Sequence, residues 1–187
     1  MAISLKKGGS FNLTKKEPSL KKIMVGLGWE QKSSGGSMDL DCSVFMLGSN
    51  GKLPADEYFV FYNNLKSPDG GLQHTGDNRT GAGDEDDEMI LVNLPLVSGS
   101  VQDVLFVVSI HEAQARRHHF GLLSEAYIRI MDVETKREIL RYDLDAEFAN
   151  KTDVEFGRLK RVDGDWTFVA SGMGATQGLQ GYVDAYA

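Results

Sequence analysis

The apolar residues of this chain fall into short stretches that are bounded by turn residues, a pattern typical of an all-β domain. The stretches that we predict to be strands are Phe11–Leu13, Lys22–Gly28, Asp39–Leu47, Tyr58–Tyr62, Met89–Asn93, Val104–Ile110, Ala126–Met131, Glu138–Asp143, Thr152–Arg161 and Trp166–Ser171. Between the last two, Asp163-Gly164 is a strong signal for a two-residue hairpin turn. This many short strands favour a sandwich of two mainly antiparallel sheets.

Two segments have a helical pattern instead. "HEAQARRHHF" at 111–120 has few β-branched residues and follows a predicted strand, and "LQGYVDAY" at 179–186 is long enough for one or two helical turns. No shift in composition marks a linker, and no internal repeat is visible. We therefore expect a single domain over 1–187, a length sufficient to bury a core.

The segment 63–88 departs from the strand pattern. It holds seven carboxylates against Lys66 and Arg79, a net charge of −5, with five glycines, one proline and almost no apolar content beyond Leu65 and Leu72. A loop of this length without hydrophobic content is either disordered or functional. A solvated acidic loop is one interpretation. The other is that a bound cation orders the segment.

The remaining charge and the single cysteine narrow the function classes. The net charge of −7 argues against nucleic acid as a partner. Residues 1–28 carry +5, which we interpret as a solvated lysine surface, with contact to an anionic partner or membrane surface as the alternative. No apolar run could span a membrane, and the N-terminus lacks a signal-peptide core. Cys42 is alone, which excludes an internal disulfide, and we expect a buried thiol in a cytoplasmic protein.

The acidic segment supplies the oxygen ligands that calcium prefers, namely carboxylates, amide oxygens and backbone carbonyls. Asp77 and Glu88 stand at positions 1 and 12 of a twelve-residue window, as in an EF-hand. Arg79 and Gly81, however, occupy positions where an EF-hand has oxygen ligands. The flanking segments also have strand character, so this is not an EF-hand.

Two further groups of oxygen ligands lie near strand ends. On a strand, alternate residues share a face, so Asp39, Asp41 and Ser43 lie together while the apolar residues between them face the core. Asn63 and Asn64 follow a strong strand where the acidic segment begins. Loop ends of a rigid sandwich suit a cation, because the sheet fixes some ligands and the loops supply others. We expect these groups and the acidic segment to form one composite site.

Several long motifs of the chain resemble those of the TerD family of tellurium-resistance and stress-response proteins. They are "VGLGW", "DLDCSVFML", "FVFYNNLKSPDG", "HTGDNRTGAGDEDDE", "VSIHEA" and "RYDL", and the resemblance runs from "ISLKKGG" to "SGMGATQGLQG". It implies a β-sandwich with an acidic site for two calcium ions. The positions that inherit the ligand role by this resemblance are Asp39, Asp41, Asn63, Asn64, Asp69, Asp77, Asn78, Asp86, Asp87 and Glu88. Many members have a small residue where Glu85-Asp86 stands here.

The resemblance also implies a place in tellurite resistance or stress response, with partners among the other proteins of that system, membrane-associated ones included. No nucleophile–base set, P-loop or Rossmann fingerprint is present. His118-His119 is a poor metal pair, and His111-Glu112 is interpreted as a structural pair. We therefore expect a calcium-binding assembly module that is not an enzyme. A metal-dependent phosphoester hydrolase and a nucleotide-binding protein that use the same acidic cleft remain alternatives.

Overall fold

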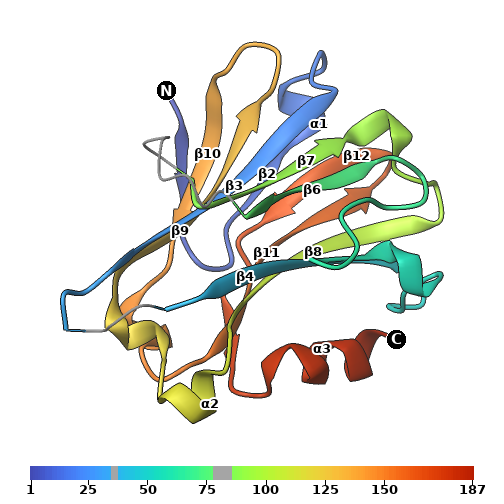
Figure 1. Ribbon diagram of the computed structural model, residues 1–187. Helices are drawn as coiled ribbons and strands as arrows, with labels where there is room; N and C mark the ends of the chain where they lie inside the picture. The colour runs from blue at the N-terminus through green and yellow to red at the C-terminus, as the bar shows by residue number, and fades with distance from the viewer. Residues whose placement is uncertain (35–37, 78–85) are drawn as a thin grey trace.

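The computed structural model describes residues 1–34, 38–77 and 86–187, which form two β-sheets packed face to face (Figure 1). Sheet A has the strand order β1-β10-β9-β3-β7-β6. Its strands are β1 (Ile3–Leu5), β3 (Lys22–Gln31), β6 (Leu72–Asp77), β7 (Glu88–Asn93), β9 (Leu123–Asp132) and β10 (Glu138–Asp143). Only the short β1 runs parallel to its neighbour among these described pairs.

Sheet B has the order β2-β12-β11-β8-β4-β5, and β13 also pairs with β11. Its strands are β2 (Ser10–Asn12), β4 (Leu40–Gly48), β5 (Phe59–Val60), β8 (Val101–Ile110), β11 (Asp153–Val162), β12 (Asp165–Val169) and β13 (Met173–Ala175). The pairs are antiparallel. The predicted all-β sandwich is therefore confirmed.

Strand alternation builds the core between the sheets. In β7, Glu88, Ile90 and Val92 are buried while the intervening residues are partly exposed. In β4, Leu40, Cys42 and Val44 belong to the core, as the alternation predicts. The opposite face of sheet B carries a second apolar cluster, in which Phe45 and Leu105 pack against Tyr182.

Short helices connect or cover the sheets. They are α1 (Leu13–Lys16), α2 (Ala113–Arg116), α3 (Gly178–Tyr186) and the 3-10 turns η1 (Asp56–Tyr58), η2 (Leu94–Leu96), η3 (Phe120–Leu122) and η4 (Ala146–Phe148). Figure 1 shows α3 lying along the outer face of sheet B and α2 at one end of the sandwich. Within the described residues, no helix combines the length and apolar character that a membrane crossing requires.

The ten predicted strands all appear, nine of them with shifted ends and Glu138–Asp143 with the predicted bounds, and α3 matches the predicted C-terminal helix. The hairpin at Asp163-Gly164 is also confirmed, since both residues have positive φ and Val162 pairs with Asp165. The helix predicted over 111–120 is wrong in extent. It is confined to α2, which ends where Arg117 takes a left-handed φ of 56°.

The prediction of a continuous loop over 63–88 is also corrected. Residues Leu72–Asp77 form β6, which pairs with β7 as an edge strand of sheet A. Sequence pattern alone misses it because Leu72 is the one apolar residue of β6, so the apolar signal is weak. Residues 84–87 therefore belong to the connection between two paired strands, whereas Asp77 ends β6 and Glu88 begins β7. Asn78 and residues 79–85 of that connection lie outside the described residues.

Candidate metal centre

Glu88 is a buried carboxylate that joins the two sheets. It begins β7, and the alternation of that strand directs its side chain inward beside Ile90, so that Glu88 is only 4% exposed. The backbone N–H of Cys42 in β4 donates a 2.6 Å hydrogen bond to Glu88 Oε2. The short β5 pairs with Val44 and Phe45 of β4, and Cys42 lies outside this paired stretch. A carboxylate from sheet A thus takes the place of a neighbouring strand at this point of sheet B.

His74 of β6 lies beside the same carboxylate. Its Nε2 is 3.5 Å from Glu88 Oε2, and both side chains are buried. Burial is the largest influence on Glu88 and raises its pKa, while the hydrogen bonds and charge of His74 and the Cys42 N–H oppose the rise. The negative charge of Asp41 raises the pKa of Glu88 further, so the two carboxylates are close enough to repel each other.

Asp41 lies on the outer face of sheet B, next to the Glu88 end of the sandwich. Its strand position is directly opposite Ser109 of β8, and the side chain is partly buried. Asp39, which precedes β4, is exposed, and its carbonyl accepts the His111 N–H at 2.8 Å. The predicted alternation of Asp39, Asp41 and Ser43 with core residues is supported by burial, because Leu40, Cys42 and Val44 enter the core, although Asp39 itself precedes β4.

The two ends of the acidic connection are held together by strand pairing. The Cα atoms of Asp77 and Glu88 are register partners at the end of the β6–β7 pair, after an irregularity that follows His74. Asp87 continues the same arrangement, since its N–H donates to Leu27 O and its Oδ2 accepts the Trp29 N–H, both at 2.8 Å. Asp77, Asp87 and Glu88 therefore meet at one end of sheet A.

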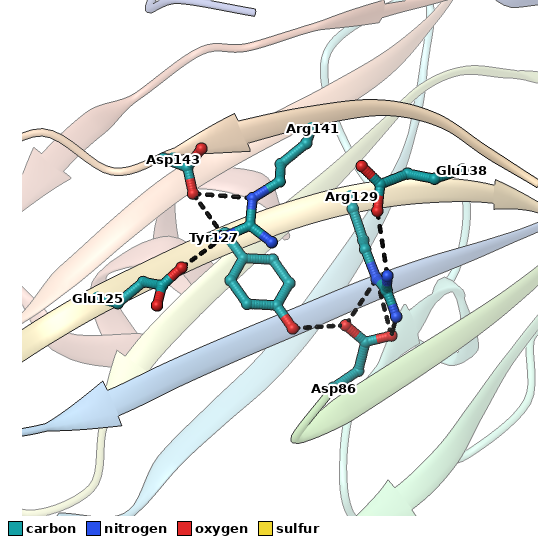
Figure 2. Close-up of polar contacts among 7 residues, drawn as sticks. All are labelled: Asp86, Glu125, Tyr127, Arg129, Glu138, Arg141 and Asp143. Atoms are coloured by element: carbon teal, nitrogen blue, oxygen red, sulfur yellow. Dashed lines mark hydrogen bonds and ion pairs between the residues drawn. The ribbon is translucent and has the colours of Figure 1, made fainter. Parts of the chain in front are cut away.

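Asp86 points away from this end and into a polar network on the outer face of sheet A (Figure 2). Its carboxylate accepts the Tyr127 hydroxyl at 2.9 Å and the Arg129 guanidinium at 2.8 Å through Nη2 and 3.0 Å through Nε. Arg129 also reaches Glu138 Oε2 at 3.1 Å, and Arg141 stacks on the Tyr127 ring. The side chain of Asp86 is 3% exposed. These bonds give Asp86 a structural role as the anchor of the acidic connection.

Two glycines of β3 make room for this network. A Cβ at Gly26 would overlap the Asp86 carboxylate, and a Cβ at Gly28 would overlap the Tyr127 ring. Alternate glycines on one strand face are thus the sequence signal for the network, in the motif "VGLGW". The sequence reasoning missed Tyr127 and Arg129, because nothing in their local pattern distinguishes them from ordinary strand residues.

Three other predicted ligands lie in the segment between β5 and β6. Asn63 is an exposed turn residue, and Asn64 Nδ2 donates to Phe59 O at 2.7 Å and Glu57 O at 3.0 Å. Both oxygens of Asp69 are used in a turn: Oδ1 accepts the Ser67 hydroxyl and the Gly71 N–H, and Oδ2 accepts the Ser98 N–H. Gly71 bonds Asn93, at the far end of β7 from Glu88. The structure does not bring Asp69 to the Glu88 end.

The carboxylates at the Glu88 end fit a hard cation, which prefers oxygen ligands. Within the described residues, no three His, Cys, Asp or Glu side chains form a group that could hold a metal ion. A complete site at this end requires further oxygen ligands beyond those of Asp41, Asp87 and Glu88. The predicted ligand Asn78 lies outside the described residues, as does the position of the Asp77 side chain.

Comparison with known proteins agrees with this architecture. The family model described as the TerD domain matches residues 1–186. The chain is 49% identical to tellurium resistance protein TerD of an Alcaligenes species over 96% of this chain and 94% of the relative. It is 46% identical to general stress protein 16U of Bacillus subtilis, with the same coverage of both chains.

A solved structure shares the fold. The crystal structure of a homologue of the telluride resistance protein TerD from Streptomyces coelicolor superposes with a TM-score of 0.69, covering 88% of this chain and 95% of that one at 22% identity. The family match over the whole sandwich, together with relatives at nearly half identity, fixes the relationship. The chain belongs to the TerD family.

Proposed function

We propose that this protein is a calcium-binding module of a tellurite-resistance or stress-response system. The observation that carries the proposal is Glu88, a buried carboxylate beside Asp41 at the point where the acidic β6–β7 connection enters the sandwich. Burying a carboxylate is costly, and a divalent cation would add to the compensation that His74 and the Cys42 N–H provide. The names of the relatives support the biological setting, since they include tellurium resistance and general stress proteins.

The proposed ligand set is Asp41, Asp77, Asn78, Asp87 and Glu88, for two calcium ions. Asp41 comes from sheet B and the others from sheet A or its connection, so that binding joins both sheets. Calcium in this setting supplies charge neutralisation and cross-linking of the oxygen ligands. Asp69 and Asp86 are left out of the set, because their hydrogen bonds hold Asp69 in a turn toward the far end of β7 and Asp86 in the network on the outer face of sheet A.

We favour binding over hydrolysis as the role of the site. A general acid or base has to reach a substrate, but His74, the histidine beside Glu88, is buried. The module then acts by presenting a calcium-dependent surface to other proteins of the resistance system. Turnover of generic phosphoesters with calcium, magnesium or manganese that disappears in Asp77→Asn would support the hydrolase instead.

Isothermal titration calorimetry of the chelator-treated protein with calcium tests the proposal. We expect two equivalents to bind in the parent, and Glu88→Gln to weaken binding by tenfold or more, which corresponds to about 1.4 kcal/mol. Glu134→Gln is the matched control, since Glu134 is an exposed carboxylate in the turn between β9 and β10. Absence of calcium binding by the parent, or equal affinity in Glu88→Gln, would refute the assignment.

A further inference from the structure

The outer face of sheet B carries an apolar surface that the chain's own C-terminal helix covers (Figure 1). Four buried side chains of β4 and β8 form this surface, here called the α3 seat: Phe45, Leu47, Leu105 and Val107. The residues of α3 that pack on it are Leu179, Tyr182, Val183 and Tyr186. Their spacing of i, i+3, i+4 and i+7 is the one by which an amphipathic helix binds an apolar surface. The α3 seat is therefore a helix-binding surface.

The helix that occupies the seat is intrinsically weak. α3 has nine residues, of which Gly178 and Gly181 are glycines. No side chain caps its N-terminus, its first turn holds no acidic residue and its last turn holds no basic one. Isolated helices of this length are marginal in water, and a glycine inside a helix weakens it further. α3 therefore depends on its packing against sheet B to stay helical.

Polar groups beside the α3 seat are buried without partners. Of the six buried side-chain oxygen and nitrogen atoms that make no hydrogen bond within the described part of the chain, three belong to this region: Ser43 Oγ, Asp103 Oδ1 and Asp153 Oδ2. The first two residues are the register partners of Val107 and Leu47, so they share the outer face of sheet B. Asp153 contacts the start of α3, because its Oδ1 accepts the Gly178 N–H at 2.9 Å. A buried polar atom without a partner is unfavourable, so α3 is an imperfect cover for this surface.

The charges beside the seat indicate what a better occupant carries. The outer face of β8 and β11 holds three carboxylates against two cations, a net charge of −1, from Asp103, Asp153, Glu155, Arg158 and Lys160. Arg158 is engaged by Glu155, to which its Nε and Nη2 both donate at 2.7 Å. α3 has no lysine or arginine, and its one charged side chain is Asp184. Lysine and arginine are the side chains that donate most strongly to a carboxylate, and α3 offers none to the unpaired oxygens.

We propose that the α3 seat is a docking site for an amphipathic helix of another protein, which displaces α3 and carries lysine or arginine where α3 has none. The apolar anchors of that helix repeat the spacing of the α3 residues, and its cations donate to Asp103 and Asp153. α3 then acts as an internal cover, which lowers the apparent affinity for the partner by the fraction of molecules in which the seat is open.

Helix docking at this seat is independent of the proposed calcium site. None of the four seat residues belongs to the proposed calcium set, and Glu88 enters the interior from sheet A. Glu88→Gln should therefore weaken calcium binding and leave helix docking in chelator within twofold of the parent. The two proposals fail separately.

Fluorescence anisotropy with designed peptides tests the seat in chelator. The probe is a labelled peptide of about 15 residues, long enough for a helix, with leucine at i, i+3, i+4 and i+7 positions and lysine on its flanks. One control replaces every lysine by glutamate, and the other has the same composition in scrambled order. In physiological salt, we expect the lysine probe to bind at micromolar affinity and at least tenfold more tightly than either control. Equal binding of a control, or no binding of the probe at millimolar concentration, would overturn the proposal.

Residue-resolved hydrogen exchange shows where the probe binds. Displacement of α3 should speed the exchange of the amides of Tyr182–Tyr186 at least tenfold, while the amides of β10 in sheet A keep their parent rates. A probe that instead binds the acidic β6–β7 connection leaves the protection of α3 unchanged. Binding without faster exchange in α3 would therefore contradict the assignment to the seat.

Variants of the cover and of the seat give opposite expectations. Tyr182→Ala removes the most buried anchor of α3, 5% exposed, and should tighten probe binding about tenfold because α3 competes less. Val183→Ala, at a partly buried position, should tighten it about threefold and serves if the melting curve of Tyr182→Ala shows a loss of fold. Asp103→Asn should weaken probe binding about threefold, whereas Glu134→Gln should not.

The same variants distinguish a foreign helix from a second copy of this chain. Unchanged probe affinity in Tyr182→Ala and Val183→Ala would contradict the role of α3 as a cover. Sedimentation of Tyr182→Ala as a dimer, with no gain in probe affinity, would show that the seat accepts the same chain instead and would overturn the proposal.

Discussion

The backbone N–H of Cys42 in sheet B donates a 2.6 Å hydrogen bond to the carboxylate of Glu88 in sheet A. The bond lies at the end of the sandwich where the acidic connection begins, and both residues are buried. The Glu88 side chain thus accepts a backbone hydrogen bond from β4 and also belongs to the proposed calcium site. Any change in the position or charge of Glu88 is therefore expected to reach both sheets.

Replacing Glu88 by alanine and by glutamine separates these two roles. Alanine leaves the Cys42 N–H buried without an acceptor, which costs about 1–3 kcal/mol, whereas glutamine retains an acceptor oxygen. In chelator, we expect the free energy of unfolding of Glu88→Ala, measured by urea denaturation, to be lower than that of Glu88→Gln by about 1–3 kcal/mol. Both variants should lose calcium affinity. Equal stability of the two variants would mean that the hydrogen bond contributes little.

The raised pKa of Glu88 predicts a specific dependence of stability on pH. The folded protein then holds the Glu88 proton at pH values where the unfolded chain has already released it. Between the unfolded pKa, near 4.5, and the raised folded pKa, this group makes stability fall as pH rises. This pH dependence is measured by urea unfolding of the parent and of Glu88→Gln in chelator, at several pH values between the two pKa values of Glu88. The free-energy difference, parent minus variant, should decrease with rising pH, and a flat difference would contradict the shift.

Gly26→Ala tests the space that the Asp86 network needs. The added Cβ would overlap the Asp86 carboxylate, so the carboxylate must leave Arg129 or the backbone must shift. We expect a loss of about 2–4 kcal/mol in unfolding free energy, in the range found for overpacking combined with a disturbed buried ion pair. Gly99→Ala is the control, because a Cβ there meets no neighbour, and it should change stability by less than about 0.5 kcal/mol. Similar losses in both variants would argue against a steric cause.

The architecture was predictable from sequence where burial alternates strongly. Strands such as β4 and β8 have runs of apolar residues, "VFML" and "VLFVV". The turn at Asp163-Gly164 has residues that tolerate the positive φ that a two-residue hairpin requires. The edge strand β6 escaped prediction because its polar residues are held by pairing with β7 rather than by burial. The α2 prediction was limited for a different reason, because Arg117 ends the helix by adopting a positive φ.

The sequence predicted which residue types form the candidate site, but not which of these residues lie together in the fold. Carboxylates that share a short segment point in different directions, so Asp86 bonds Arg129 while Glu88 enters the interior and bonds Cys42. Asp69 resembles the other acidic residues in sequence, yet it closes a turn at the far end of β7. The direction of each side chain depends on strand register and on distant partners, and neither is encoded in the local pattern of one sequence.

Asp41 and Asp77 provide the decisive test of a site composed from both sheets. Asp41 belongs to sheet B, whereas Asp77 ends a strand of sheet A opposite Glu88, and ligands of one ion placed on both sheets are energetically coupled. We expect Asp41→Asn and Asp77→Asn each to weaken calcium binding by tenfold or more, about 1.4 kcal/mol. The double variant should lose less than the sum of the two, as measured by calorimetry.

Two further variants serve as controls for this cycle. Asp69→Asn and Asp86→Asn also remove an acidic charge from the same segment, but both carboxylates are engaged in structural hydrogen bonds. These variants should lower the melting temperature and keep calcium affinity within about threefold of the parent, because loss of a remote charge has only a screened effect. If Asp41→Asn binds calcium like the parent while Asp69→Asn or Asp86→Asn does not, the ions lie elsewhere in the acidic segment. That result would contradict the proposal that residues of both sheets form one calcium site at Glu88.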